Sequence, residues 1–241
     1  MVFSFSNFIN EIRSFKKVSS GFIENPGILD AYKDRARQIR NKYRGGPIEL
    51  GIFEENPLYT TVSDGEYNRS GEGEHKVRGK ITSVWDVKPI LEPNKSEPSE
   101  FRIAGKASTK VCILSECNER ISMWRVEVGV EDSPGTHFHV QVEGDDENLP
   151  FPESISVPRL PSVLVTVPDA IDFLLGELFQ ESWIKRTSKQ SDAMKQWRPH
   201  QQRRLSSLLN WKAEQVKDTM GSAWIAIKDE KPDPGLFLQN D

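Results

Sequence analysis

The chain has 241 residues, of which 36% are hydrophobic and 28% are charged. These values are typical of a globular protein with its own core, and they exclude a chain that is disordered throughout. No apolar run is long enough to cross a membrane, residues 1–17 do not have the pattern of a secretory signal, and the two cysteines are typical of a reducing compartment. We therefore expect a cytoplasmic protein that folds without a disulfide.

The N-terminal residues 1–46 predict two amphipathic helices. Apolar residues recur at helical spacing over residues 4–17 and again over residues 28–43. The opposite face of the second helix is basic, because six Lys or Arg residues stand against one Asp between residues 33 and 44. The candidate binding residues on this face are Arg37, Arg40 and Arg44.

Residues 47–143 predict an antiparallel sheet, because the periodicity of the apolar residues changes from helical spacing to two. The expected strands are residues 47–53, 80–90 and 101–114, followed by a hairpin. Short connections between consecutive strands favour antiparallel pairing, and a sheet of this kind can curl into a half barrel. The outer face of the third strand is basic, and its candidate binding residues are Lys106 and Lys110.

The predicted hairpin at residues 121–143 has one apolar and one polar face. A turn at residues 131–135 separates two arms in which apolar and polar residues alternate. If the arms pair symmetrically, Arg125 lies opposite Glu143, and Glu127 lies opposite Gln141 and diagonally next to a histidine. This polar face is the strongest candidate site in the sequence.

One interpretation of the polar face is acid and base chemistry on a phosphodiester, as in small ribonucleases. Histidines or a carboxylate would move protons while an arginine or lysine stabilises the developing charge. The candidate catalytic residues are His137, His139, Glu127, Arg125 and Arg159. The alternative is structural, with both histidines held in the sheet by neighbouring carboxylates.

A second interpretation is a divalent metal site formed by His137, His139 and Glu143. An HxH pair followed by a carboxylate resembles half of the cupin metal motif, although the flanking glycines are missing and the downstream His200 lies in a predicted helix. The polar histidine strand also resembles that of the 2H phosphoesterases, which need two such elements where this chain has one. Cupins use a small antiparallel barrel, which agrees with the predicted sheet.

The C-terminal third follows a proline-rich loop at residues 144–165. Thr166 begins a helix that continues through Trp183, with a hydroxyl cap and a proline in the first turn. Residues 185–198 are expected to form a basic connection, Pro199 to open a last helix, and residues 222–228 to form a closing strand. The candidate binding residues of this basic region are Arg198, Arg203 and Arg204.

Together these patterns predict a single α+β domain over residues 1–241, with a curved antiparallel sheet flanked by N-terminal and C-terminal helices. Common nucleotide-cofactor and hydrolase motifs are absent from the sequence. The leading hypothesis is an accessory or binding protein that acts in a complex, through basic helical surfaces, on nucleic acid or an acidic protein partner. The alternative is a histidine-dependent ribonuclease, phosphodiesterase or metal-binding enzyme. The sequence does not determine the oligomeric state.

Overall fold

A computed structural model describes residues 1–41, 45–63, 76–93, 95–129, 137–142 and 159–229. The helices in these ranges are α1 (Phe5–Val18), α2 (Gly27–Asn41), α3 (Val167–Thr187), α4 (Asp192–Lys217) and α5 (Ala223–Asp229). The strands are β1 (Val2–Ser4), β2 (Ile48–Ile52), β3 (Leu58–Tyr59), β4 (Val77–Ile90), β5 (Glu100–Ser115), β6 (Arg120–Val128), β7 (Phe138–Val142) and β8 (Leu160–Pro161). The predicted α+β class is confirmed.

All eight strands belong to one antiparallel sheet with the order β2-β4-β5-β6-β7-β8. The short strands β1 and β3 pair with β5 and β4, respectively. In the described residues β2 and β8 do not pair with each other, so the curved sheet is not closed. The long strands β4 and β5 pair with each other over most of their length.

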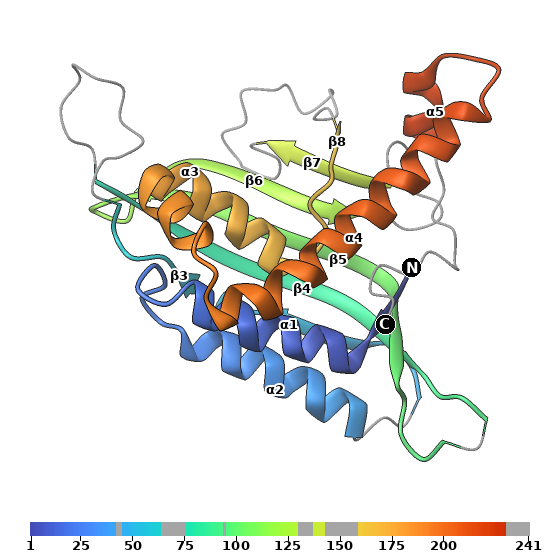
Figure 1. Cartoon of the computed structure of the whole chain (residues 1–241), viewed down its shortest axis with the longest axis horizontal. Coiled ribbons are helices and arrows are strands. Elements are labelled where there is room, and N and C mark those ends of the chain that lie inside the picture. The colour runs from blue at the N-terminus through green and yellow to red at the C-terminus, as the bar shows by residue number, and fades with distance from the viewer. Residues whose placement is uncertain (42–44, 64–75, 94, 130–136, 143–158, 230–241) are drawn as a thin grey trace.

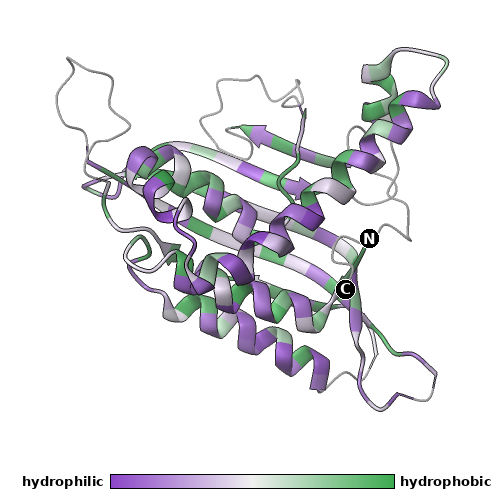
Figure 2. Ribbon diagram, viewed as in Figure 1, coloured by the Kyte–Doolittle hydropathy of each residue, from purple (hydrophilic) through white to green (hydrophobic). Residues whose placement is uncertain are grey.

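The helices form a layer on one face of the sheet (Figure 1). Aromatic side chains fill the space between the layers, and the rings of Phe3 and Phe101 stack at 5.3 Å beside Trp85. Figure 2 shows apolar and polar residues alternating around α1 and α2, as expected for helices with one buried side. One cluster of buried hydrophobic residues extends from Met1 to Trp211 and therefore joins the N-terminal and C-terminal helices.

Local signals in the sequence explain where α1 and α3 begin. Ser4 caps α1 by accepting a hydrogen bond from the backbone of Asn7. Thr166 and Asp169 form a reciprocal capping box at α3, which confirms the predicted start of this helix. At Gln180 the φ angle of 22° breaks the helical geometry, so α3 is kinked before its last two turns.

The predicted start of the last helix at Pro199 is wrong. Helix α4 begins seven residues earlier, at Asp192, and Ser191 caps it by accepting a hydrogen bond from Met194. The buried side chains of Met194 and Trp197 anchor this first part of the helix to the core. Tertiary packing therefore outweighs the local preference of proline for a first turn.

The predicted closing strand at residues 222–228 is also wrong, because this segment forms the short helix α5. In the described part of the chain, α5 contacts α4 rather than an edge of the sheet. Trp224 and Ile225 remain exposed. The segment has apolar residues at nearly every position, so periodicity could not distinguish a strand from a helix.

The strand β8 lies in the region predicted to be only a proline-rich loop. Leu160 and Pro161 pair with Val140 and His139 of β7 and thus extend the sheet by one strand. Residues 143–158 of this region lie outside the described part of the chain. None of the helices built from the described residues has the length and apolar character needed to cross a membrane.

Candidate functional site

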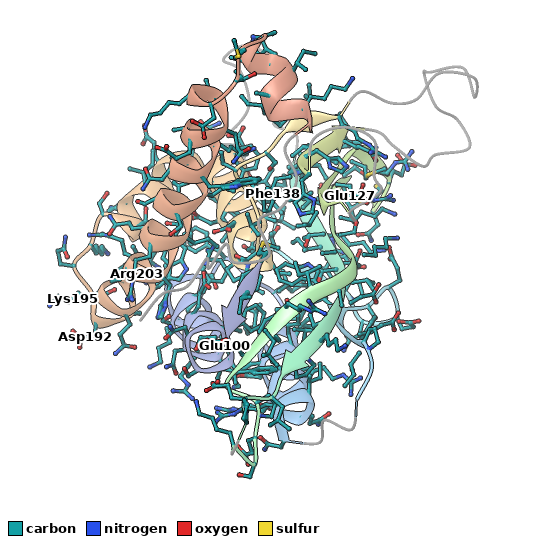
Figure 3. All side chains as sticks on the ribbon, turned by 90° about the vertical axis from the view of Figure 1, so that its right-hand side faces the viewer. Glu100, Glu127, Phe138, Asp192, Lys195 and Arg203 are labelled. Atoms are coloured by element: carbon teal, nitrogen blue, oxygen red, sulfur yellow. The ribbon has the colours of Figure 1, made fainter. Side chains whose placement is uncertain are left out.

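The sheet face opposite the helices carries polar side chains that the strand registers align. Two rungs from β4 to β7, two residues apart and therefore on the same face, contain Thr82, Lys110, Arg125 and Gln141 in one and Val84, Ser108, Glu127 and His139 in the other. Figure 3 shows Glu127 on the side of the sheet away from the helices, whereas Phe138 lies nearer to them. In this view no helix of the described chain covers the polar face.

We call the charged and hydroxyl-bearing residues on this side the open-face cluster. Its members are Glu54, Lys80, Thr82, Lys106, Ser108, Lys110, Arg125, Glu127 and His139. A shallow cavity of about 130 Å³ lies among them. The cavity is lined by Ile52, Glu54, Thr82, Ser83, Val84, Lys106, Ser108, Lys110 and Arg125. Three of these residues are cations and one is a carboxylate, so the lining favours an anion.

The carboxylate of Glu54 enters the cluster from the turn that follows β2. It accepts a hydrogen bond from Nζ of Lys80 at 2.7 Å and lies 3.7 Å from Nζ of Lys110. Lys80 contacts Oε2 of Glu54, whereas Lys110 and the hydroxyl of Thr82, at 3.4 Å, both face Oε1. Partial burial raises the pKa of Glu54, but Lys80 and Lys110 outweigh this effect and hold the pKa below its ordinary value. Glu54 is therefore ionised at neutral pH.

Glu127 connects the cationic part of the cluster to His139. Its Oε2 lies 3.3 Å from Nε2 of His139, and its Oε1 lies 3.6 Å from Nη1 of Arg125. Burial raises the pKa of Glu127, whereas the hydrogen bond with His139, the charge of Arg125 and a hydrogen bond with Ser108 lower it and prevail. The geometry thus brings a carboxylate, an imidazole and a guanidinium together, as predicted for the acid and base site.

The predicted register of the hairpin is wrong by two residues. Glu127 lies directly opposite His139, and Arg125 lies opposite Gln141 rather than Glu143. A shift of two residues leaves every side chain on its predicted face, because side chains alternate with a period of two. Consequently the predicted polar face survives while the cross-strand partners change.

Both histidines of the hairpin are buried, whereas the sequence predicted a polar outer face. His139 is only 2% exposed, and β8 pairs beside it. His137 precedes β7 and packs edge-on against the ring of Phe138. Burial, followed by the positive charges of the N-terminal amino group and Lys212, lowers the pKa of His137 to about 4. This imidazole is therefore neutral at physiological pH.

The proposed metal site cannot be assembled from the described residues. Glu143 lies outside them, and in the remaining chain no group of three or more His, Cys, Asp and Glu side chains is arranged to hold a metal ion. His200 lies in α4, as predicted, and does not join the hairpin histidines in such a group. Metal binding by His137, His139 and Glu143 stays a prediction.

Arg159 directly precedes β8, which pairs with β7, so the backbone brings it to the edge next to the histidine strand. However, Arg159 does not line the cavity of the open-face cluster. Its catalytic role stays a prediction.

The basic face of α2 is largely neutralised by local contacts. Arg37 forms an ion pair with Asp34 at 2.9 Å, and Arg40 lies 3.6 Å from Glu97. Arg44 lies outside the described residues. The paired cations of α2 offer less charge to a partner than the sequence alone suggested.

On α4 the three candidate arginines have different environments. Arg198 donates a hydrogen bond to the carbonyl of Thr187, and the exposed Arg203 donates one to the carbonyl of Pro199. Arg204 is only 2% exposed, so the prediction of a binding residue on a basic surface is wrong for this position. The three arginines therefore do not form one continuous basic surface.

The guanidinium of Arg204 joins three helices in the interior. Its Nη1 and Nη2 donate to the two oxygens of Glu11 in α1 at 2.8 and 2.7 Å. Its Nε donates to Asp169 in α3 at 2.9 Å, and Nη2 donates to the other oxygen of this carboxylate. We call Arg204, Glu11 and Asp169 the buried ionic cluster. Burial opposes its charge, but the two carboxylates prevail and raise the pKa of Arg204.

Four members of the open-face cluster are not among the predicted site residues: Glu54, Lys80, Thr82 and Ser108. Lys80 and Thr82 alternate with the buried Ile81 along β4, so their position on the polar face could have been read from the pattern. Glu54 had no such signal, because it belongs to a turn whose direction depends on the pairing of β2 and β3 with β4.

No protein-family model, curated protein or solved structure matches this chain.

Proposed function

We propose that the protein binds single-stranded nucleic acid through the open-face cluster and does not cleave it. The observation that carries this proposal is the cavity lined by Lys106, Lys110 and Arg125 on a sheet face that no described helix covers. In keeping with the sequence, we further propose that the protein acts in the cytoplasm as an accessory subunit of a complex. The proposed binding surface is the sheet rather than the basic helices.

The chemistry of the face suits a phosphate backbone. The cations come from three neighbouring strands, so they can contact successive phosphates along an extended strand and release the counterions bound there. Phe53 is 38% exposed, and its ring lies beside Gly51, which pairs with the cavity-lining Val84, so an aromatic side chain is available near the cavity for stacking on a base. Flat sheet faces with aromatic and basic side chains recognise single-stranded nucleic acids in other proteins.

Cleavage is the weaker candidate, although the contact between Glu127 and His139 specifically favours acid and base chemistry. A catalytic imidazole must reach the proton that it transfers, directly or through one water molecule. His139 is 2% exposed and does not line the cavity, so its position supports a role in orienting Glu127. Glu127 in turn lies beside Arg125, which lines the cavity.

Charge reversal at two lysines tests this proposal. We expect Lys106→Glu combined with Lys110→Glu to weaken binding of a fluorescein-labelled single-stranded oligonucleotide by roughly tenfold or more, because two phosphate contacts become repulsive. Fluorescence anisotropy at fixed salt measures the affinity, and gel analysis of the same oligonucleotide measures cleavage.

The comparison variant Arg198→Glu with Arg203→Glu reverses two charges on α4. We expect it to bind within about twofold of the unmodified protein, because α4 lies on the other side of the sheet. A larger loss in the α4 variant than in the sheet variant would favour the basic helical surface. Cleavage that His139→Ala abolishes without changing thermal unfolding would overturn the statement that the protein does not cleave its ligand.

A further inference from the structure

Among the residues that the structure describes, Glu54 is the one carboxylate that lines the cavity of the open-face cluster. Its oxygens contact Lys80 and Lys110, two cations of the open-face cluster, of which Lys110 also lines the cavity that would hold a bound phosphate. It also lies within hydrogen-bonding distance of the hydroxyl of Thr82. A carboxylate with two cations and one hydroxyl around it has the same pattern of contacts as one phosphate of a nucleic acid.

The position of Glu54 allows it to leave these contacts at low cost. Its side chain is 54% exposed and belongs to a tight turn, which is closed by a backbone hydrogen bond from Asn56 to Phe53. Rotation of the side chain would therefore disturb neither the strands nor the core. Exposed ion pairs of this kind contribute little to stability, so breaking them costs little.

We propose that Glu54 is an internal competitor that occupies the anion site of the free protein, and that a phosphate group displaces it on binding. The inference rests on the proposed function, because it assigns the occupant and the regulation of the same site. While bound, Glu54 keeps Lys80 and Lys110 in place on the sheet, so the site is formed in advance. The same contact lowers the affinity for any ligand that must break it.

The test compares Glu54→Gln with Glu55→Gln in the full-length protein. Glu55 is the next residue of the turn and is also exposed, but it does not line the cavity. Both variants remove one negative charge from the same turn, so their difference isolates the contacts of Glu54. The probe is a fluorescein-labelled single-stranded oligonucleotide, whose binding is followed by anisotropy.

We expect Glu54→Gln to bind the probe about fivefold more tightly than the unmodified protein, because two ion pairs no longer have to break. Glu55→Gln should change the affinity by less than about twofold, through weak screened charge alone. If the unmodified protein binds and both variants change its affinity equally, the internal competitor is excluded while the proposed function stands. If neither the unmodified protein nor Glu54→Gln binds, both proposals are wrong, whereas binding by Glu54→Gln alone would support both.

Discussion

The protein contains two ionic clusters that differ in how their charges are satisfied. In the buried ionic cluster, all three nitrogen atoms of the Arg204 guanidinium donate to carboxylates, and the residue is 2% exposed. In the open-face cluster, Lys110 and Glu54 are 3.7 Å apart and both are accessible to solvent. The first cluster joins three helices in the interior, and the second lies on a sheet face that no described helix covers.

The difference shows how surroundings determine what a charge can do. A buried charge is costly unless fixed partners satisfy it, so the buried ionic cluster has no remaining capacity for a ligand. A charge on the open face keeps much of its hydration, so its contacts are weak and can be exchanged. We therefore expect stability to depend on the first cluster and binding on the second.

The largest expected effect comes from removing the cation of the buried ionic cluster. Arg204→Met leaves Glu11 and Asp169 buried without their cation, and we expect it to lower the free energy of unfolding by roughly 3 to 5 kcal/mol. The matched variant Lys110→Met removes a cation from the open face and should cost less than about 1 kcal/mol. Urea unfolding followed by circular dichroism measures both. Equal losses in the two variants would contradict the distinction between the clusters.

The burial of His137 provides a smaller expected effect on stability. Its imidazole lies near the N-terminal amino group and Lys212, whose positive charges disfavour its protonation. Its pKa is about 4 in the folded protein, below its ordinary value of 6.5, so the unfolded chain binds the proton more tightly. Its contribution to stability is complete above pH 6.5 and is lost as the pH falls toward 4. We expect the stability of the unmodified protein to decrease more steeply over this range than that of His137→Gln. Urea unfolding at a series of pH values gives the two slopes, and parallel curves would show that His137 does not titrate as described.

The sequence predicted the fold class and the polar sheet face because both depend on local periodicity. Apolar residues alternate along β5 and β6, so one face had to be buried and the other left polar. The register could not be predicted in the same way. Either pairing of Glu127, with Gln141 or with His139, keeps the same faces, so the alternation of apolar and polar residues does not distinguish between them.

The buried ionic cluster could not be predicted, because it depends on long-range packing. Arg204 lies 193 residues from Glu11 in the sequence, and only the packing of α4 against α1 brings them together. On sequence alone Arg204 is indistinguishable from Arg203, which remains exposed one position earlier on α4. The same limit applies to Glu54, whose turn reaches the open face only after β2 and β3 pair with β4.

The salt dependence of binding tests the central claim most directly, because it counts the cations that contact phosphate. We predict that Lys106→Gln with Lys110→Gln makes the slope of log affinity against log salt shallower by about 1.4, since each phosphate contact to a single strand contributes about 0.7. The control Lys195→Gln with Lys217→Gln removes two exposed lysines from α4 and should leave the slope unchanged. An unchanged slope in the sheet variant, or a shallower slope in the α4 control alone, would contradict binding through the open-face cluster.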